Sequence, residues 1–431
     1  MSRSILFISI LVFLSSIPQF GKVKPLYLYY NQSYGARALS MGNAFTAVAD
    51  DLSAVYKNPA GIAEFDHPQL YLDYRSDRLS YAHDTETDTS GTTPRSYAYQ
   101  LTSTLKNADF LSISAPVTFW GMKWNFALSY YRFIPYNVSA EENGQLTTAG
   151  ITDTASLVIN GRNGIDVLGF TGAFYLFNNF SAGITVQRFF NSGSINYSYT
   201  LPGSVSYTND YSEKINGWNM ILGLLFKLDR DIALGFSYQS RLRGPLDSDL
   251  TYQDTGTASN PVTSSSLADV NLPPQFSMGV MVRPFALWTL SADYSILYWS
   301  KADVSNYFSS TATLPFPVRD DFTFSQQDNI NLRTGTEIKI PFKRFTVFIR
   351  GGIFKERQLF TDASDGYVNV TGYSLGLGLD VSSRIRLDLG YMRQNSSWKE
   401  TGYFDSASTV NSNLKNNTLC LAATVYFGPP F

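Results

Sequence analysis

The sequence predicts an all-β protein, a 14-stranded antiparallel transmembrane β-barrel with an N-terminal plug (hatch) inside its lumen. Two observations predict the wall: apolar residues alternate with small or polar ones in about fourteen segments, and short connections alternate with long ones. The plug is predicted by residues 34–60, which are rich in Gly and Ala and precede the first alternating segment. After residue 21 no stretch approaches the roughly 18 to 20 continuous apolar residues of a spanning helix, so a membrane crossing would use strands.

Residues 1–21 have the layout of a secretory signal peptide. Arg3 precedes the apolar run from Ile5 to Leu14, and a polar tail containing Pro18 follows. The apolar run is too short to span a bilayer as a helix. We therefore expect export, with cleavage near Gly21 and, since no cysteine lies there, no lipoprotein processing.

Composition excludes several classes of protein. The net charge of −2 argues against a nucleic-acid binder, which would need a basic excess or a basic stripe. Cys420 is the only cysteine, so neither an internal disulfide nor a cysteine-based metal site can form. The aromatic content of 15% suits two interfacial girdles of a membrane barrel, with a soluble aromatic-rich sandwich as the alternative.

Residues 22–66 form the expected hatch. A barrel of eight strands is filled by its own side chains, whereas roughly 16 to 18 strands leave an aqueous channel, so about fourteen strands need an occupant. Small residues between Gly35 and Ala44 would let the hatch backbone pack closely inside such a tube. Asp50 or Asp51 could cap a short helix running through Tyr56, and Asn58-Pro59 would end it.

Residues 67–431 form the expected wall, with the clearest alternation in the stretches from Met122 to Tyr130 and from Ile385 to Met392. The expected strands cover 68–75, 108–117, 121–134, 165–176, 179–190, 215–228, 231–243, 272–283, 286–299, 328–340, 344–356, 370–380, 383–394 and 414–428. Tight links are expected near 118–120, 177–178, 229–230, 284–285, 341–343 and 381–382, and long polar loops at 76–107, 135–164, 244–271 and 300–327.

Those connection lengths also predict the orientation of the barrel. Outer-membrane barrels pair short periplasmic turns with long external loops, so both ends of the wall would be periplasmic. The aromatic Phe431 resembles the terminal signal that the outer-membrane assembly machinery reads, although Gly428-Pro429-Pro430 departs from the usual pattern before it.

Residues of the hatch carry a family resemblance. They are Gly35, Arg37, Gly42, Asp50, Asp51, Asn58, Pro59 and Ala60. At these positions the chain resembles the N-terminal hatch of the FadL-type (OmpP1/FadL/TodX) outer-membrane transport proteins. The resemblance implies that the hatch closes the periplasmic end and that apolar ligands enter from outside. It further implies an opening in the wall, which in the family is formed by a kinked third strand; here Pro135 ends the expected third strand.

The function implied by this resemblance is passive uptake of hydrophobic small molecules, such as long-chain fatty acids, across the bacterial outer membrane. The implied partners are the ligand, outer-membrane lipid and the assembly machinery, with a monomer as the default state. The hatch residues would then either respond to an arriving ligand or only hold the hatch in shape.

Three arginines on the lumen-facing positions of their strands are candidates to bind an anionic head group. They are Arg333, Arg350 and Arg386, and the nearby Phe348 and Phe354 would contact the apolar part of a ligand. The alternative is that the arginines pair with carboxylates on the same faces, for which Glu337 and Asp388 are available.

Nothing in the sequence indicates catalysis or a cofactor. His67 and His83 are the only histidines, and neither has the spacing of a metal site. Nucleophile-elbow, phosphate-loop and zinc-protease motifs do not occur. We therefore expect no enzyme activity, no cofactor and no metal.

Two other functions remain open. The segment from Gly35 to Ala38 matches the barrels related to PorV, the shuttle proteins of type IX secretion, at least as well as it matches the fatty-acid carriers. Such a barrel would handle protein cargo, which should copurify with it. A structural or adhesive surface barrel is the third option, for which the long loops would serve and the lumen would be blocked.

Overall fold

The computed structural model describes residues 34–88, 95–148, 151–201, 205–254, 261–301, 327–361, 366–401 and 409–428. The expected signal peptide, the first residues of the expected hatch and Phe431 lie outside these ranges. Within them, no helix is both long enough and apolar enough to cross a membrane.

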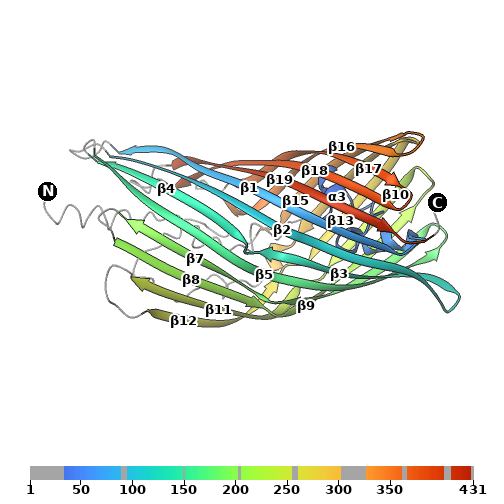
Figure 1. Ribbon diagram of the computed structural model, residues 1–431, viewed down its shortest axis with the longest axis horizontal. Helices are drawn as coiled ribbons and strands as arrows, with labels where there is room; N and C mark the ends of the chain where they lie inside the picture. The colour runs from blue at the N-terminus through green and yellow to red at the C-terminus, as the bar shows by residue number, and fades with distance from the viewer. Residues whose placement is uncertain are drawn as a thin grey trace.

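The described strands form one antiparallel sheet that closes on itself (Figure 1). β1 pairs on one side with β2 and on the other with β19, so the described sheet forms a closed barrel. The strands are β1 (Gln69–Asp88), β2 (Arg95–Phe119), β3 (Met122–Pro135), β4 (Val138–Thr148), β5 (Ile151–Phe177), β6 (Phe180–Phe190), β7 (Ser192–Leu201), β8 (Val205–Ile215), β9 (Gly217–Lys227), β10 (Ile232–Gln239), β11 (Leu242–Asp254), β12 (Val262–Leu272), β13 (Gln275–Phe285), β14 (Trp288–Leu297), β15 (Asn329–Pro341), β16 (Thr346–Thr361), β17 (Tyr367–Ser382), β18 (Ile385–Thr401) and β19 (Thr409–Tyr426).

The expected count of fourteen strands is wrong, because the described residues contain nineteen. Each of the fourteen expected ranges contains a strand, and the five further strands are β4, β7, β8, β11 and β12. β4, β11 and β12 occupy much of 135–164 and 244–271, which the sequence assigned to loops. The stretch 76–107 is likewise largely strand.

The error has a physical cause in the length of the wall. β2 has 25 residues and β5 has 27, whereas a tilted strand crosses a bilayer in about ten. The wall therefore continues past the membrane, where its outward side chains face water. Outward apolar residues are no longer required there, although Val158 and Leu267 remain exposed, and the alternation that identifies a strand in the sequence weakens.

The short connections lie close to their expected positions. β2 and β3 are joined through residues 120–121, β5 and β6 through 178–179, and β17 and β18 through 383–384. These turns lie at the end of the barrel that carries the C label in Figure 1. This is the end that the sequence analysis expects on the periplasmic side.

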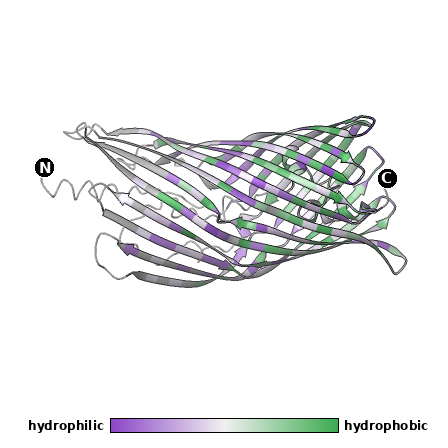
Figure 2. Cartoon of the chain, in the orientation of Figure 1, coloured by the Kyte–Doolittle hydropathy of each residue, from purple (hydrophilic) through white to green (hydrophobic). Residues whose placement is uncertain are grey.

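Hydrophobic residues are most frequent in the half of the wall nearest the short turns (Figure 2). Along β9, Trp218, Met220, Leu222 and Leu224 are exposed on the outside, while the intervening residues are buried inside. In a bilayer the outward side chains contact lipid, which is why a barrel wall can be apolar on its outer face.

The wall is interrupted on one side of the barrel. β3 and β4 both pair with β2 and with β5, and Tyr136 and Asn137 separate them. Glycines in the neighbouring strands make room for the interruption. A Cβ atom at Gly161 would lie 1.8 Å from the Tyr136 carbonyl oxygen, and one at Gly193 would lie 2.1 Å from the Tyr136 ring. Similar breaks separate β6 from β7, β8 from β9, β10 from β11, and β12 from β13.

Residues 34–66, here called the inner segment, lie within the ring of strands (Figure 1). The segment contains α3 (Ala36–Ser40), α4 (Ala54–Lys57) and the 3-10 helix η2 (Pro59–Glu64). A second 3-10 helix, η3 (Trp299–Lys301), follows β14. α3 packs on β16 to β19, while η2 packs on β3, β5, β6 and β9. The inner segment therefore reaches different parts of the wall and is buried along nearly its whole length.

Candidate functional site

Polar side chains of the wall bind backbone amides of the inner segment. Asp73 on β1 accepts a hydrogen bond from the Gly35 amide at 2.9 Å. Asp293 on β14 accepts from the amides of Phe45 and Thr46, each at 2.9 Å. Because these amides have no helical partner, the wall carboxylates satisfy donors that would otherwise be buried and unpaired.

Asn58 fixes the turn that carries Pro59 and Ala60. Its Nδ2 donates to the carbonyl of Thr46 at 2.8 Å and to that of Leu224 on β9 at 3.0 Å, and its Oδ1 accepts from the Ala60 amide at 3.2 Å. α4 ends at Lys57, directly before this turn. One side chain therefore ties two parts of the inner segment to the wall.

Two wall glycines that the sequence analysis did not single out pack directly against this turn. A Cβ at Gly223 would lie 2.2 Å from the Asn58 Oδ1, and a Cβ at Gly183 would lie 2.5 Å from the Pro59 carbonyl carbon. Glycine at inward positions of β6 and β9 could have signalled such a close approach of another backbone.

Arg37 joins the inner segment to a buried ion network in the wall. Its Nε and Nη2 donate to the two carboxylate oxygens of Glu337, each at 2.8 Å, and its Nη1 donates to Asp50. Burial by itself lowers the pKa of Arg37, but the negative charges of Asp50 and Glu337 outweigh it and the pKa is raised. Arg37 is therefore a permanent cation.

The three arginines proposed for a head group all have carboxylate partners. Arg350 donates to Glu337 and to Asp388, each at 2.6 Å. Arg333 pairs with Glu356 at 2.8 Å, and Arg386 lies 3.3 Å from a carboxylate oxygen of Asp380. The structure thus shows the pairing that the sequence left as an alternative.

The two aromatic candidates lie in different places. The Phe348 ring packs against two of these cations, with 5.3 Å from its centroid to the Arg350 guanidinium carbon and 4.1 Å to that of Arg386. Phe354 lies instead against Gly372 on β17, where a Cβ would be 2.4 Å from its ring. The five candidates therefore do not form one cluster.

The expected capping of a helix by Asp50 or Asp51 is wrong. α4 begins at Ala54 after Ser53, whose side chain makes no capping hydrogen bond. Asp51 instead accepts from the amide and hydroxyl of Ser53, at 2.9 and 2.5 Å, in the turn before the helix. Burial raises the pKa of Asp51, and Arg37 opposes that shift.

Gly35 and Gly42 both adopt positive φ angles, of 96° and 64°, which favour glycine. Gly42 also lies against the wall, where a Cβ would be 2.8 Å from the carbonyl oxygen of Thr334. Its amide donates to the Ser374 hydroxyl at 2.8 Å. The sequence singled out both glycines without indicating this contact.

Lys57 at the end of α4 has an unusually low pKa for a lysine. Burial lowers its pKa from 10.5 to about 7, and the nearby positive charge of Arg333 adds to the shift. Asp293 and Glu356 act in the opposite direction. Near neutral pH, Lys57 is therefore close to its titration midpoint.

Aromatic rings meet where the inner segment faces the middle of the wall. The centroid of Tyr34 lies 4.7 Å from that of Tyr131 and 4.8 Å from that of Tyr56, and Phe110 stacks on Tyr131 at 5.8 Å. These four residues form the aromatic cluster.

Buried apolar side chains continue from the aromatic cluster at the level of the strand breaks. They are Ile134, Ile165, Phe189, Ile215, Leu242, Leu272 and Leu297, here called the apolar layer. All seven are at most 1% exposed and belong to one cluster with the aromatic residues. The sequence analysis missed the layer because its residues come from seven strands far apart in the chain.

Backbone pairing between β2 and the third strand is interrupted beside this layer. The register runs from Phe119 to Phe110 against β3 and resumes only at Leu105 against β4. Residues 106–109 and 132–137 therefore face each other without ladder hydrogen bonds. Across this gap the Asn137 Nδ2 donates to the Asn107 Oδ1 at 3.2 Å.

Among the described residues, no group of three or more His, Cys, Asp or Glu side chains could hold a metal ion. The arrangement described above consists of structural ion pairs, seated turns and apolar side chains.

Comparison with known proteins identifies the family. The sequence model of the outer-membrane protein transport family (OMPP1/FadL/TodX) matches residues 29–424. No curated protein matches the chain. Among solved structures, a Pseudomonas aeruginosa FadL homologue is 14% identical with a TM-score of 0.61, over 93% of this chain and 100% of that one.

Two toluene transporters have the same fold. TbuX of Ralstonia pickettii is 14% identical with a TM-score of 0.54, over 93% of this chain and 100% of its own. TodX of Pseudomonas putida is 14% identical with a TM-score of 0.51, over 93% and 99%. The family match covers most of the sequence, and the closed barrel agrees with it. The chain is therefore a bacterial outer-membrane transport protein that belongs to the OMPP1/FadL/TodX family.

Proposed function

We propose that this chain is a passive channel for hydrophobic small molecules, in which the inner segment acts as the hatch. The apolar layer, continuous with the aromatic cluster against the inner segment, carries this proposal. Ligand sites for apolar compounds are lined mainly by hydrophobic and aromatic side chains, with few polar groups. A channel for ions or sugars would not gain from burying seven aliphatic and aromatic side chains in its lumen.

The hatch would be held by contacts at its two ends. Gly35, Arg37, Gly42, Asp50 and Asp51 belong to the part that meets the ion network, while the turn of Asn58, Pro59 and Ala60 rests on β6 and β9. The inner segment also contributes the rings of Tyr34 and Tyr56 to the aromatic cluster. A ligand that binds the barrel more tightly when the hatch is displaced would shift the equilibrium from the docked to the displaced hatch. The size of the shift is set by the difference between its affinities for the two states.

The gap between β2 and the third strand is the proposed exit. Along most of the wall, neighbouring strands are tied by ladder hydrogen bonds, and separating them would break several bonds at once. At residues 106–109 and 132–137 no ladder exists. A ligand leaving the apolar layer sideways would therefore cross the wall at this point.

The arginine pairing favours a neutral ligand. A carboxylate would have to displace Glu337, Asp388 or Glu356 from a buried ion pair, which costs several kcal/mol when a partner is left uncompensated, about 3 to 5. Phe348 and Phe354 remain candidates for contact with an apolar ligand. A neutral hydrocarbon is therefore the proposed substrate, with a fatty acid as the alternative.

Uptake into outer-membrane vesicles tests this function. We expect vesicles containing the protein to take up labelled toluene faster than vesicles without it, and faster than they take up oleate. Gly193→Ala should slow uptake because its Cβ would strike the Tyr136 ring at the break, whereas Gly351→Ala is the matched control, with no atom nearer than 3.8 Å.

Several outcomes would count against the proposal. Equal uptake with and without the protein would reject a channel for these compounds. Equal slowing by Gly193→Ala and Gly351→Ala would reject the break as the exit. A stoichiometric protein that copurifies with a barrel free of apolar ligand would favour the secretion shuttle instead.

A further inference from the structure

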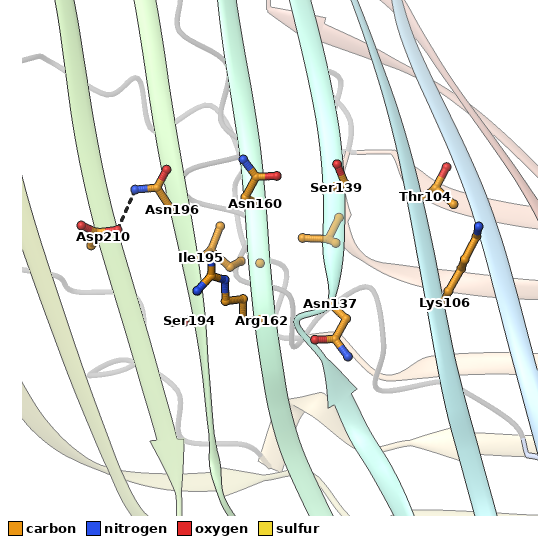
Figure 3. A pocket seen from close by; sticks show the side chains of 12 residues that line it. Thr104, Lys106, Asn137, Ser139, Asn160, Arg162, Ser194, Ile195, Asn196 and Asp210 are labelled. Carbon is orange, nitrogen blue, oxygen red and sulfur yellow. Dashed lines mark hydrogen bonds between the residues drawn. The ribbon is translucent and has the colours of Figure 1, made fainter.

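The outer face of the wall contains a hollow of about 760 Å³ beside the break between β3 and β4 (Figure 3). Strands β2, β4, β5, β7 and β8 contribute its side chains. Lys106 and Arg162 line it with Asn137, Asn160 and Ser139, and all five are exposed. Their inward neighbours along the strands are buried, so these side chains point away from the lumen.

The hollow is lined by two positively charged side chains, Lys106 and Arg162, that are not in ion pairs within the described part of the chain. By contrast, Arg132 pairs with Asp166 at 2.8 Å, and the Arg188 guanidinium carbon lies 5.0 Å from the Trp218 ring. Asp210, the acidic residue that lines the hollow, accepts a hydrogen bond from Asn196 at 2.7 Å. Besides Asp210, the polar lining consists of two cations, hydroxyls and amides, which suit phosphate and sugar groups.

The distance of the hollow from the apolar part of the outer surface distinguishes between a phospholipid headgroup and a longer one. The last outward apolar side chains below it are Leu111 on β2 and Leu168 on β5, which are 43% and 44% exposed. Lys106 and Arg162 lie about five and six residues further along, which at about 3.3 Å per residue and a tilt of about 45° is roughly 12 to 14 Å. The polar zone of a phospholipid bilayer is only about 5 to 8 Å deep on each side.

We propose that this hollow binds the phosphorylated saccharide headgroup of an outer-leaflet glycolipid. The headgroup of such a lipid extends above the acyl chains, which would contact the apolar band below. A phosphate would pair with Lys106 and Arg162, while sugar hydroxyls would bond to the amides of Asn137 and Asn160. This site lies outside the barrel and does not depend on the proposed uptake.

Native mass spectrometry of the full-length protein in detergent tests the site. The probes are a rough-type lipopolysaccharide with a phosphorylated inner core, its dephosphorylated form, and phosphatidylglycerol. We compare wild type with the double variant Lys106→Gln/Arg162→Gln. The matched control is Lys343→Gln/Arg344→Gln, which neutralises two exposed cations at the periplasmic turn between β15 and β16.

We expect wild type and control to retain the phosphorylated glycolipid, and the double variant to bind it roughly 20- to 30-fold more weakly, since each cation near the surface contributes about a fivefold gain. The dephosphorylated form should bind wild type as weakly as the phosphorylated form binds the variant. Equal losses in the control would overturn the proposal, as would equal retention of the dephosphorylated form or of phosphatidylglycerol. If millimolar inorganic phosphate alone displaces the bound glycolipid, the hollow is a site for free phosphate rather than for the lipid.

Discussion

Arg37 is the residue on which the docking of the inner segment depends most. Its guanidinium binds Glu337 through two donors, and Glu337 also accepts from Arg350, so one carboxylate of the wall is shared by two arginines. Removing one member of such a buried set leaves a charge without compensation, which costs more than the pair contributes while intact.

Arg37→Gln should loosen the inner segment without unfolding the wall. Loss of a buried partner should lower the free energy for opening of the inner segment by about 3 to 5 kcal/mol. The backbone amides of 34–66 should therefore exchange their hydrogens faster. Arg344→Gln removes an exposed arginine from the short turn between β15 and β16 and is the control. If the two variants exchange alike, Arg37 does not hold the segment.

Lys57 should make docking of the inner segment depend on pH. Its pKa is about 7 when docked and 10.5 otherwise, so between these values the released segment binds one more proton. Docking then becomes more favourable as pH rises from about 7 to about 10.5, and it gains nothing from this group below pH 7.

The measurement for Lys57 is hydrogen exchange of 34–66 at pH 6, 7.5 and 9, corrected for intrinsic exchange rates. Protection should grow with pH in the wild type, and Lys57→Met should flatten that dependence. An unchanged slope in the variant would assign the pH effect to another group. Arg333, Asp293 and Glu356 are the charges that act on Lys57.

Among the helices and strands, close approach of backbones decides how the inner segment fits the wall. Its short helices α3 and α4 have five and four residues, too few to be stable alone. They persist because the wall supplies partners and because glycines on both sides leave room. A Cβ atom added at Gly42 in the inner segment or at Gly223 in β9 would lie within 3.0 Å of atoms on the opposite side.

Gly42→Ala and Gly121→Ala form a matched test of this fit. Both glycines have positive φ, of 64° and 72°, so alanine costs each about 1 to 2 kcal/mol in backbone strain. Only the Cβ added at Gly42 would also clash with the wall, because a Cβ at Gly121 has no atom within 4 Å. We expect a larger fall in the thermal midpoint for Gly42→Ala, measured by heat-dependent migration in SDS gels. Equal falls would mean that backbone strain alone accounts for both.

For the molecule as a whole, the structure places the short turns and the long strand ends at opposite ends of one barrel (Figure 1). Hydrophobic residues are most frequent in the half nearest the short turns (Figure 2). This asymmetry predicts a barrel that lies in the membrane with most of its polar wall projecting outside the cell.

Cysteine labelling in intact cells checks that orientation. Lys399→Cys, exposed near the far end of β18, should react with a membrane-impermeant maleimide. Arg344→Cys, at a short turn, should react only after the outer membrane is permeabilised. Cys420 is buried and should contribute little background. The reverse labelling pattern would invert the orientation.

Local patterns in the sequence were enough to predict the class of fold, the strands in the membrane and the short turns, because period-two alternation and turn residues are local signals of half-buried strands. At two of the predicted hatch positions the local signal has a structural counterpart, since Gly42 has a positive φ that favours glycine and the Asn58 side chain caps η2. Local patterns failed for β4, β7, β8, β11 and β12, where water on the outer face removes the alternation.

The pairing of charges and the gathering of apolar residues, by contrast, depend on the tertiary structure. Arg37 and Glu337 are 300 residues apart in sequence, and the pairing of Arg350 with Asp388 depends on the register of three neighbouring strands. The apolar layer likewise combines single residues from seven strands. Local patterns carry no information on such contacts, because closure of the barrel alone sets which strands face one another across the lumen.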